Sequence, residues 1–300
     1  MMPRRPPLPP PHPALKVSVV VPARNEEALV GSCLEALAEQ EGVSPEDFEV
    51  LLVLDHCTDE TEARVREIAD AHPHLELHFL DGPGKGSGHA RRVGMELASA
   101  RLLSLGRTKG LIASTDADTV VAPDWLAAQL GAVSRGAVAI GGRIELAEDP
   151  SLPESIFRWH IERGRRRHES LLSEPEQLGK TEHWQFSGAS LALTAEVYRE
   201  IGGLEPRVAL EDEHLEDVLR RQGVPIERLL SVRVTTSARL QGRAKQGLAH
   251  DLAAVVTKLR DDDRGPPVTM LRQDGFGDAS GDSQDAQEHA LSRKVTQRGS

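Results

Sequence analysis

Short apolar runs alternate with longer amphipathic segments along the first half of the chain. Apolar runs at 16–21, 49–54, 75–80 and 137–144, and a further one that starts at residue 111, predict strands. Between them lie segments whose apolar positions repeat with helical spacing, as at Leu29, Cys33 and Leu37. Asn25 is placed to cap the first of these helices, and Pro123 to start the helix after the fourth strand. The pattern predicts an α/β protein.

Strands that alternate with helices form a mostly parallel sheet through right-handed crossovers. Ligands of such sheets bind outside the carboxyl ends of the strands. The charged and polar residues of this chain gather at those ends, namely Arg24, Asn25, Glu26, Asp55, Lys85, Arg91, Asp116 and Asp118. We therefore expect a binding site at this edge of the sheet.

The fourth strand stops abruptly on two carboxylates, Asp116 and Asp118. Residues two apart in an extended chain point to the same side, so the two carboxylates repel each other unless a positive charge lies between them. A divalent cation that holds a nucleotide diphosphate suits this position. A solvated turn is the alternative, because Asp-x-Asp also occurs by chance.

A glycine-rich segment, 81–92, follows the third strand and carries Lys85 and Arg91. Glycines let backbone N–H groups approach a phosphate, and the two cations add charge. The spacing is not that of a Walker A loop, and a flexible turn remains the alternative. Asp55, at the end of the second strand, is either an acceptor for the N–H of a uracil or other base, or an ordinary helix-entry carboxylate.

Composition limits the remaining possibilities. The formal net charge is −11 and the pI about 5.6, which argues against nucleic acid as a partner. Two cysteines without a C-x-x-C pair fit a reducing cytosol, so we expect a cytoplasmic protein. No apolar run approaches the roughly 18 residues of a membrane span. We expect a disordered proline-rich leader at 1–14, one domain at 15–260 and a disordered polar tail at 261–300.

Seven short motifs occur in an order that resembles family 2 glycosyltransferases of the GT-A fold. They lie at 19–27, 53–59, 84–86 with 90–91, 115–118, 186–193, 201–204 and 210–215. The resemblance extends over residues 16–232. One departure is Arg92, where the family often has Asn.

The resemblance implies a GT-A domain that moves a sugar from a nucleoside diphosphate sugar to an acceptor hydroxyl, with inversion. It assigns Asp212 as the catalytic base with Glu211 in support, and magnesium or manganese held through Asp118 with Asp116 nearby. We expect nucleotide binding to need that metal, because Asp118 has no other obvious counter-charge. Contacts to the nucleotide sugar are expected from Pro22, Arg24, Asn25, Glu26, Asp55, Lys85, Arg91, Asp116 and Arg239.

Three questions remain open in the sequence. A nucleotidyltransferase on a similar sheet would favour a glycine-rich, basic loop after the first strand, which residues 22–26 do not provide. A non-catalytic nucleotide-sugar binder is the other alternative. The segment 152–168, amphipathic and then basic, is either a helix that contacts a membrane surface or a phosphate, or a solvated helix over the acceptor cleft. The sugar and the acceptor are not identified.

Overall fold

The computed structural model describes residues 5, 7–174, 178–207, 210–242 and 247–264, with side chains as far as Lys258. The chain divides into two units, 1–259 and 260–300. The first unit contains every strand among the described residues, and the second contains the last turn of α8. The rest of the predicted tail, 265–300, lies outside the described residues.

An eight-stranded sheet with the order β3-β2-β1-β4-β7-β6-β8-β5 forms the centre of the first unit. Strands β3, β2, β1 and β4 are parallel, β7 is antiparallel to both β4 and β6, and β5 is antiparallel to β8. The strands are β1 (Val17–Ala23), β2 (Phe48–Leu54), β3 (Leu77–Asp81), β4 (Leu111–Ser114), β5 (Thr119–Val121), β6 (Ala139–Leu146), β7 (Leu191–Thr194) and β8 (Ile226–Thr236).

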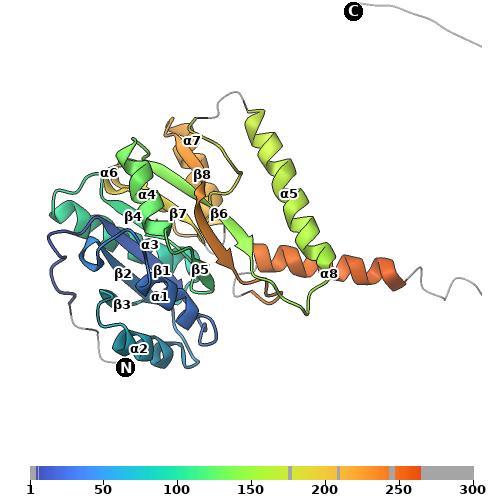
Figure 1. Ribbon diagram of the computed structural model, residues 1–300, viewed down its shortest axis with the longest axis horizontal. Helices are drawn as coiled ribbons and strands as arrows, with labels where there is room; N and C mark the ends of the chain where they lie inside the picture. Colours follow the sequence, from blue (N-terminus) through green and yellow to red (C-terminus); the bar gives the residue numbers. More distant parts are fainter. Residues whose placement is uncertain (1–4, 6, 175–177, 208–209, 243–246, 265–300) are drawn as a thin grey trace, which may run out of the picture. The chain divides into compact units, whose positions relative to one another are not determined.

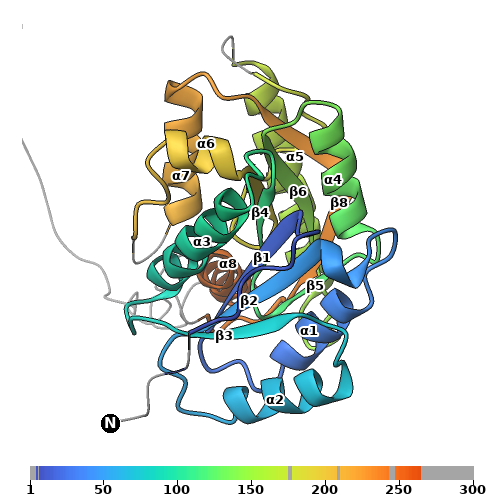
Figure 2. The same ribbon diagram turned by 90° about the vertical axis from the view of Figure 1, so that its left-hand side faces the viewer.

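Helices cover both faces of this sheet (Figures 1 and 2). They are α1 (Val30–Ala38), α2 (Thr61–Ala71), α3 (Ser87–Ser104), α4 (Trp125–Ser134), α5 (Glu154–Leu172), α6 (Ala195–Glu200), α7 (Glu211–Arg221) and α8 (Leu248–Arg264), with a 3-10 turn at Pro45–Asp47. No helix in the described part of the chain is both long enough and apolar enough to cross a membrane.

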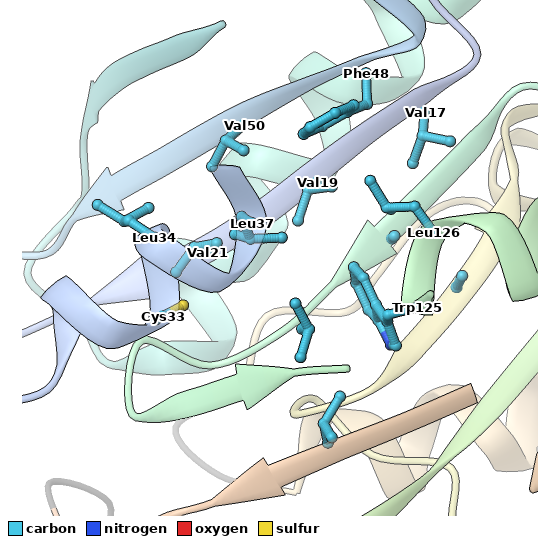
Figure 3. Packing of buried hydrophobic residues seen from close by; sticks show 14 of the residues in the cluster. Val17, Val19, Val21, Cys33, Leu34, Leu37, Phe48, Val50, Trp125 and Leu126 are labelled. Carbon is cyan, nitrogen blue, oxygen red and sulfur yellow. The ribbon is translucent and has the colours of Figure 1, made fainter. Parts of the chain in front are cut away.

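Strand β1 distributes its side chains to two cores. Val19 and Val21 pack with Leu34 of α1 and Trp125 of α4 on one face, as Figure 3 shows, whereas Val20 belongs to the core on the other face with Met95 of α3. This alternation follows from the period of two along a strand. Because both faces are covered, β1, β2 and β4 are buried throughout and mostly apolar, which is why the sequence revealed them.

The proline-rich leader was predicted to be disordered, but its described residues contact the domain. The Pro9 carbonyl accepts a hydrogen bond of 2.7 Å from Arg101, and the Pro13 carbonyl accepts one of 3.1 Å from Arg107. Arg5 pairs with Glu62 at 3.0 Å and with Asp81 at 2.7 Å. Composition missed these contacts because they involve backbone carbonyls, which a proline retains although it lacks an N–H.

The predicted capping role of Asn25 is also corrected. Helix α1 begins at Val30, with Leu29 at the cap position. Asn25 has a positive φ of 55°, and its side-chain oxygen accepts a 2.8 Å hydrogen bond from the backbone N–H of Thr58. It therefore ties the end of β1 to the segment that leads into α2.

Candidate active site

A cavity of about 500 Å³ opens at the carboxyl ends of β1, β2 and β4, where the sequence predicted a site. Most of the candidate residues line it, although Asn25 does not. The predicted residues in the lining are Pro22, Arg24, Glu26, Asp55, Lys85, Arg91, Asp116, Asp118, Glu211, Asp212 and Arg239. The fold thus brings together residues from six separate stretches of the chain.

Arg91 lies buried on α3 and binds four acceptors. Its guanidinium donates to Asp116 at 2.8 Å and to Glu211 at 3.2 Å, so it joins the two acidic motifs. It also donates to the Ser114 hydroxyl at 2.5 Å and to the Gly188 carbonyl at 3.0 Å. Burial by itself lowers the pKa of Arg91, but Asp116 and Glu211 outweigh this effect and raise it. Arg91 is therefore a permanent internal cation that positions carboxylates, and its predicted contact with a phosphate stays a prediction.

Asp55 fixes the glycine-rich loop. Its two carboxylate oxygens accept hydrogen bonds from the backbone N–H groups of Gly84 at 2.5 Å and Gly86 at 3.0 Å. Both glycines have positive φ, and a Cβ on Gly84 would lie 2.6 Å from the His56 ring. This turn needs glycine at position 84, and it presents Lys85 to the cavity. The structure thus shows Asp55 bound to the loop at the cavity wall, and its predicted contact with a base stays a prediction.

Asp118 has a counter-charge that the sequence did not reveal. Arg239, beyond the end of β8, lies 2.7 Å from Asp118 and forms two hydrogen bonds of 2.7 Å with Glu26. Burial and the neighbouring Asp116 raise the pKa of Asp118 to about 6, with Arg239 opposing them. The expectation that Asp118 lacks any other partner than a metal was wrong, because residue 239 is distant in sequence and reaches the site only through β8.

The two acidic residues at the start of α7, Glu211 and Asp212, have different environments. Glu211 is buried, and burial raises its pKa while Arg91 opposes the shift. Asp212 is partly exposed and lines the cavity. Its Oδ2 accepts hydrogen bonds from the Ser187 hydroxyl at 2.6 Å and the Gly188 N–H at 3.0 Å. These two donors hold the carboxylate in one orientation.

A second cavity of about 730 Å³ lies between α5, α7 and the start of α8. Its lining includes His160, Arg163 and Arg167 of α5, together with Trp184. Asp212 lines both cavities, as do Ile144, Ser187, Leu210, Gly247 and Leu248. Asp212 therefore stands where the two spaces meet.

Sequence reasoning missed three kinds of residue here. Ser114 looks like the polar end of a strand, Ser187 and Gly188 lie in the 186–193 motif without an assigned role, and Trp184 precedes that motif. The only available signal was the clustering of Ser and Gly at 187–190, which is typical of a loop that approaches another backbone closely. The cited partners are 17 to 25 residues away, so local spacing could not identify them.

Asp116 and Asp118 suit a divalent cation in part. The two carboxylates lie in the same cavity, and the raised pKa of Asp118 shows that added positive charge there would be stabilised. No group of three or more metal-ligating side chains occurs within the residues that the structure describes. A cation at this site would therefore need further ligands from a bound phosphate, and it would compete with Arg239 for Asp118.

Comparison with known proteins identifies relatives of this arrangement. The family model described as Glycosyl transferase family 2 matches residues 18–187, more than half of the chain. Dolichyl-phosphate beta-glucosyltransferase of Drosophila melanogaster is 29% identical over 158 residues, which cover 49% of this chain and 46% of that protein. Glycosyltransferase AglE of Haloferax volcanii is 29% identical over 130 residues, which cover 43% of this chain and 39% of that protein. The match thus spans less than half of either relative.

Solved structures support the same fold. Mannosyltransferase PcManGT from Pyrobaculum calidifontis, in complex with GDP-Man and Mn2+, aligns with a TM-score of 0.55 at 22% identity over 85% of this chain and 67% of that one. S. aureus TarS 1–349, in complex with UDP-GlcNAc, aligns with a TM-score of 0.55 at 16% identity over 81% of this chain and 66% of that one. The predicted GT-A fold is confirmed.

Proposed function

Because the chain belongs to glycosyl transferase family 2, we propose that it transfers a sugar from a nucleoside diphosphate sugar to a hydroxyl group of an acceptor. The observation that carries the proposal is the position of Asp212, which lines both the cavity at the strand ends and the cavity beside α5. The first cavity is assigned to the donor and the second to the acceptor. The family match also decides against the nucleotidyltransferase alternative.

The donor would bind between the end of β1 and the glycine-rich loop. Lys85 and the backbone N–H groups of the loop supply positive charge for the diphosphate, and Asp55 holds that loop in place. Two solved relatives carry GDP-Man and UDP-GlcNAc, which supports a nucleotide-sugar donor in this fold. Pro22, Arg24 and Asp55 all line this cavity, and Arg24 lies 3.9 Å from Asp55, so the base would lie beside these residues.

Asp212 would act as the general base. The acceptor oxygen forms a bond to the anomeric carbon as the bond from that carbon to the diphosphate oxygen breaks, and the acceptor proton moves to the Asp212 carboxylate. Attack from the acceptor cavity, opposite the departing diphosphate, inverts the configuration at the anomeric carbon. Ser187 and Gly188 aim the carboxylate, and Glu211 with Arg91 fixes the start of α7.

Magnesium or manganese is part of the proposal, and Asp116 and Asp118 would hold it. When bound, it would neutralise the charge of the departing diphosphate. The Mn2+ in the mannosyltransferase structure supports this assignment. Arg239 would release Asp118 in the process and remain near the diphosphate as a second cation.

A cytosolic location also remains a proposal. It is supported by Cys33 and Cys57, which are both free thiols. Fractionation of the cells that produce the protein would test it, and recovery outside the cytosol would contradict it.

A panel of UDP- and GDP-sugars tests the function. We expect one nucleotide sugar to raise the melting temperature and to be hydrolysed slowly to its nucleoside diphosphate, because water can replace an absent acceptor. Lys85→Gln should weaken that binding, since it removes a phosphate charge without changing the core. A protein that neither binds nor hydrolyses any member of the panel would contradict the proposal.

A further inference from the structure

The cavity beside α5 has walls of opposite charge. On one side, His160, Arg163 and Arg167 follow one face of α5 at helical spacing. On the other side, α7 presents Asp212, Glu213 and Glu216. The sequence indicated only that residues 158–168 are basic, and the fold now separates the arginines that face the cavity from those that do not.

The arginines on the two faces of α5 have different partners. Arg165, Arg166 and Arg167 are all exposed, but Arg165 and Arg166 bind Glu162, and Arg165 also binds Glu169, so the charges of these two are compensated along the helix. Arg163 pairs with Asp251 at 2.7 Å. Arg167 forms no ion pair with any residue in the described part of the chain. A cation that lines a cavity without a carboxylate partner is available to an anionic ligand.

Arg167 is nevertheless held in a defined position. Its guanidinium lies over the Trp184 ring, 4.7 Å from the ring centroid. Trp184 in turn packs against α5 at Gly164, where an added Cβ would lie 3.0 Å from the indole nitrogen. Glycine at position 164 thus lets the indole approach the helix and support Arg167 one turn further on. A guanidinium fixed on an aromatic face presents its N–H edge to a ligand with little loss of entropy.

From these contacts we propose that the acceptor carries an oxyanion, a phosphate or a carboxylate, which Arg167 binds while the reacting hydroxyl points to Asp212. The inference rests on the proposed transferase function and adds the chemical class of the acceptor. Glu216 pairs with Arg228 and Arg163 with Asp251, so Asp212 and Glu213 on α7 repel the anionic end and Arg167 on α5 attracts it. The cavity therefore binds such a molecule in one direction. Its volume of about 730 Å³ suits a small polar acceptor or the head of a larger one.

The lowered pKa of Arg167 agrees with this assignment. Desolvation lowers the pKa of Arg167 most and the nearby Arg163 adds to the effect, whereas Glu213, Asp251 and Glu216 oppose both. Two cations that face one cavity repel each other, and an anion bound between them offsets this repulsion.

The test measures binding of inorganic phosphate and of acetate by calorimetry, with UDP or GDP first added to fill the donor cavity. We expect one of the two anions to bind the wild type. Arg167→Gln should weaken that binding by roughly tenfold or more, and Arg167→Lys by less, because a charged hydrogen bond is lost in the first and partly kept in the second. Preference for phosphate would indicate a phosphate ester as acceptor, and preference for acetate a carboxylate.

Arg166→Gln is the matched control, since it removes the same charge from the adjacent position, where the side chain is 70% exposed and does not line the cavity. It should bind the anion like the wild type. Equal affinity of Arg167→Gln and wild type, or no binding of either anion, would overturn the inference. Nucleotide binding is measured separately, so failure of UDP and GDP to bind would count against the proposed function. The effect of the Arg167 substitutions on anion binding would still decide the acceptor class.

Discussion

A buried arginine is stable only where acceptors surround its guanidinium, and Arg91 has such an environment. Its contacts with Asp116 and Glu211 connect the turn after β4 to the start of α7. Removal of one partner of a buried charge destabilises a protein by several kcal/mol, because the remaining charge stays buried and unpaired. Residues that look alike in sequence therefore have different functions here: Glu211 supports Arg91, whereas its neighbour Asp212 faces the cavities.

Exchange of each acid for its amide separates these functions. Asp212→Asn should leave nucleotide binding and melting temperature nearly unchanged and lower turnover by roughly 100- to 10,000-fold, the usual contribution of a general base. Glu211→Gln should instead lower the melting temperature, because it leaves Arg91 with one negative partner fewer. Steady-state kinetics and thermal unfolding of both variants check this. Near wild-type turnover of Asp212→Asn would remove the base assignment.

Arg239 should compete with a metal for the same carboxylates. Arg239→Gln leaves Asp118 and Glu26 without their shared cation, so the affinity for Mn²⁺ without nucleotide should rise, by about tenfold if the pair is worth about 1.4 kcal/mol. Calorimetry with MnCl₂ measures the change. Asp118→Asn in the same experiment should abolish the gain. Identical Mn²⁺ binding by wild type and Arg239→Gln would show that the metal and Arg239 use different sites.

The buried carboxylate of Glu49 predicts a loss of stability in acid. Burial raises its pKa, but hydrogen bonds from His78, Arg101 and Ser18 outweigh burial and lower the pKa from its ordinary value of 4.5 to about 2. A depressed pKa means that the stabilisation is complete above pH 4.5 and disappears as the pH falls toward 2. Chemical unfolding at pH 7 and pH 3 should show the loss in the wild type.

Glu49→Gln is the control for this pH effect. The variant should be less stable at pH 7 by about 3–5 kcal/mol, because Arg101 loses its charged partner. It should also lose less stability than the wild type between the two pH values. The same decrease in both proteins would mean that another group causes the acid sensitivity.

At the level of elements, α3 packs on the sheet through a glycine. A Cβ on Gly94 would lie 2.3 Å from Cγ1 of Val20 in β1, so the helix can approach the strand only because that position has no side chain. Gly94→Ala should destabilise the protein by roughly 1–3 kcal/mol, the usual cost of overpacking. Urea unfolding measures it.

Gly131 in α4 offers the opposite case. A Cβ there would meet only the end of the Arg135 side chain, at 3.4 Å. Gly131→Ala should be neutral or stabilise by up to about 1 kcal/mol, because it removes backbone entropy from the unfolded chain. Equal effects of the two substitutions would show that α3 does not depend on close packing at Gly94.

Strands that are buried on both faces were easy to predict from the sequence. Strands whose position depends on pairing with distant strands were not. The apolar runs of β1 and β2 are sufficient to predict these two strands. Strand β7 has only four residues, and its antiparallel pairing with β4 and β6 depends on residues about 50 to 80 positions away. Strand β8 alternates buried and exposed residues, and the sequence analysis assigned it no strand. Strand order and direction are set by long-range contacts, which local periodicity does not encode.

The same distinction applies to the site. Its location followed from the rule for carboxyl ends of parallel strands, and the cavity lies there. The partners of its charges did not follow, since Arg91, Arg239 and Asp55 bind groups from 23 to 213 positions away. Sequence motifs predicted which residues would assemble, and only the fold could show which of them neutralise one another.

At the level of the whole molecule, the leader should contribute to stability. The sequence suggested that a chain starting at residue 15 would behave like the full protein. Contacts of Pro9 and Pro13 with Arg101 and Arg107, and of Arg5 with Glu62, now predict a lower melting temperature for that truncation. A chain that starts at Arg5 keeps all of these contacts and should melt like the full protein. Equal melting temperatures for both truncations would show that the leader adds nothing.

The position of Asp212 between two cavities also bears on how such enzymes diversify. Asp116 and Glu211, which Arg91 binds, line the cavity at the strand ends, and apart from the six residues that line both cavities the α5 cavity has its own lining. Substitutions on α5 could therefore accumulate without disturbing the charges that are proposed to hold the donor. A lineage could exchange one acceptor for another by changing a single helix, and a protein engineer could do the same by randomising the inward face of α5 while leaving the strand ends untouched.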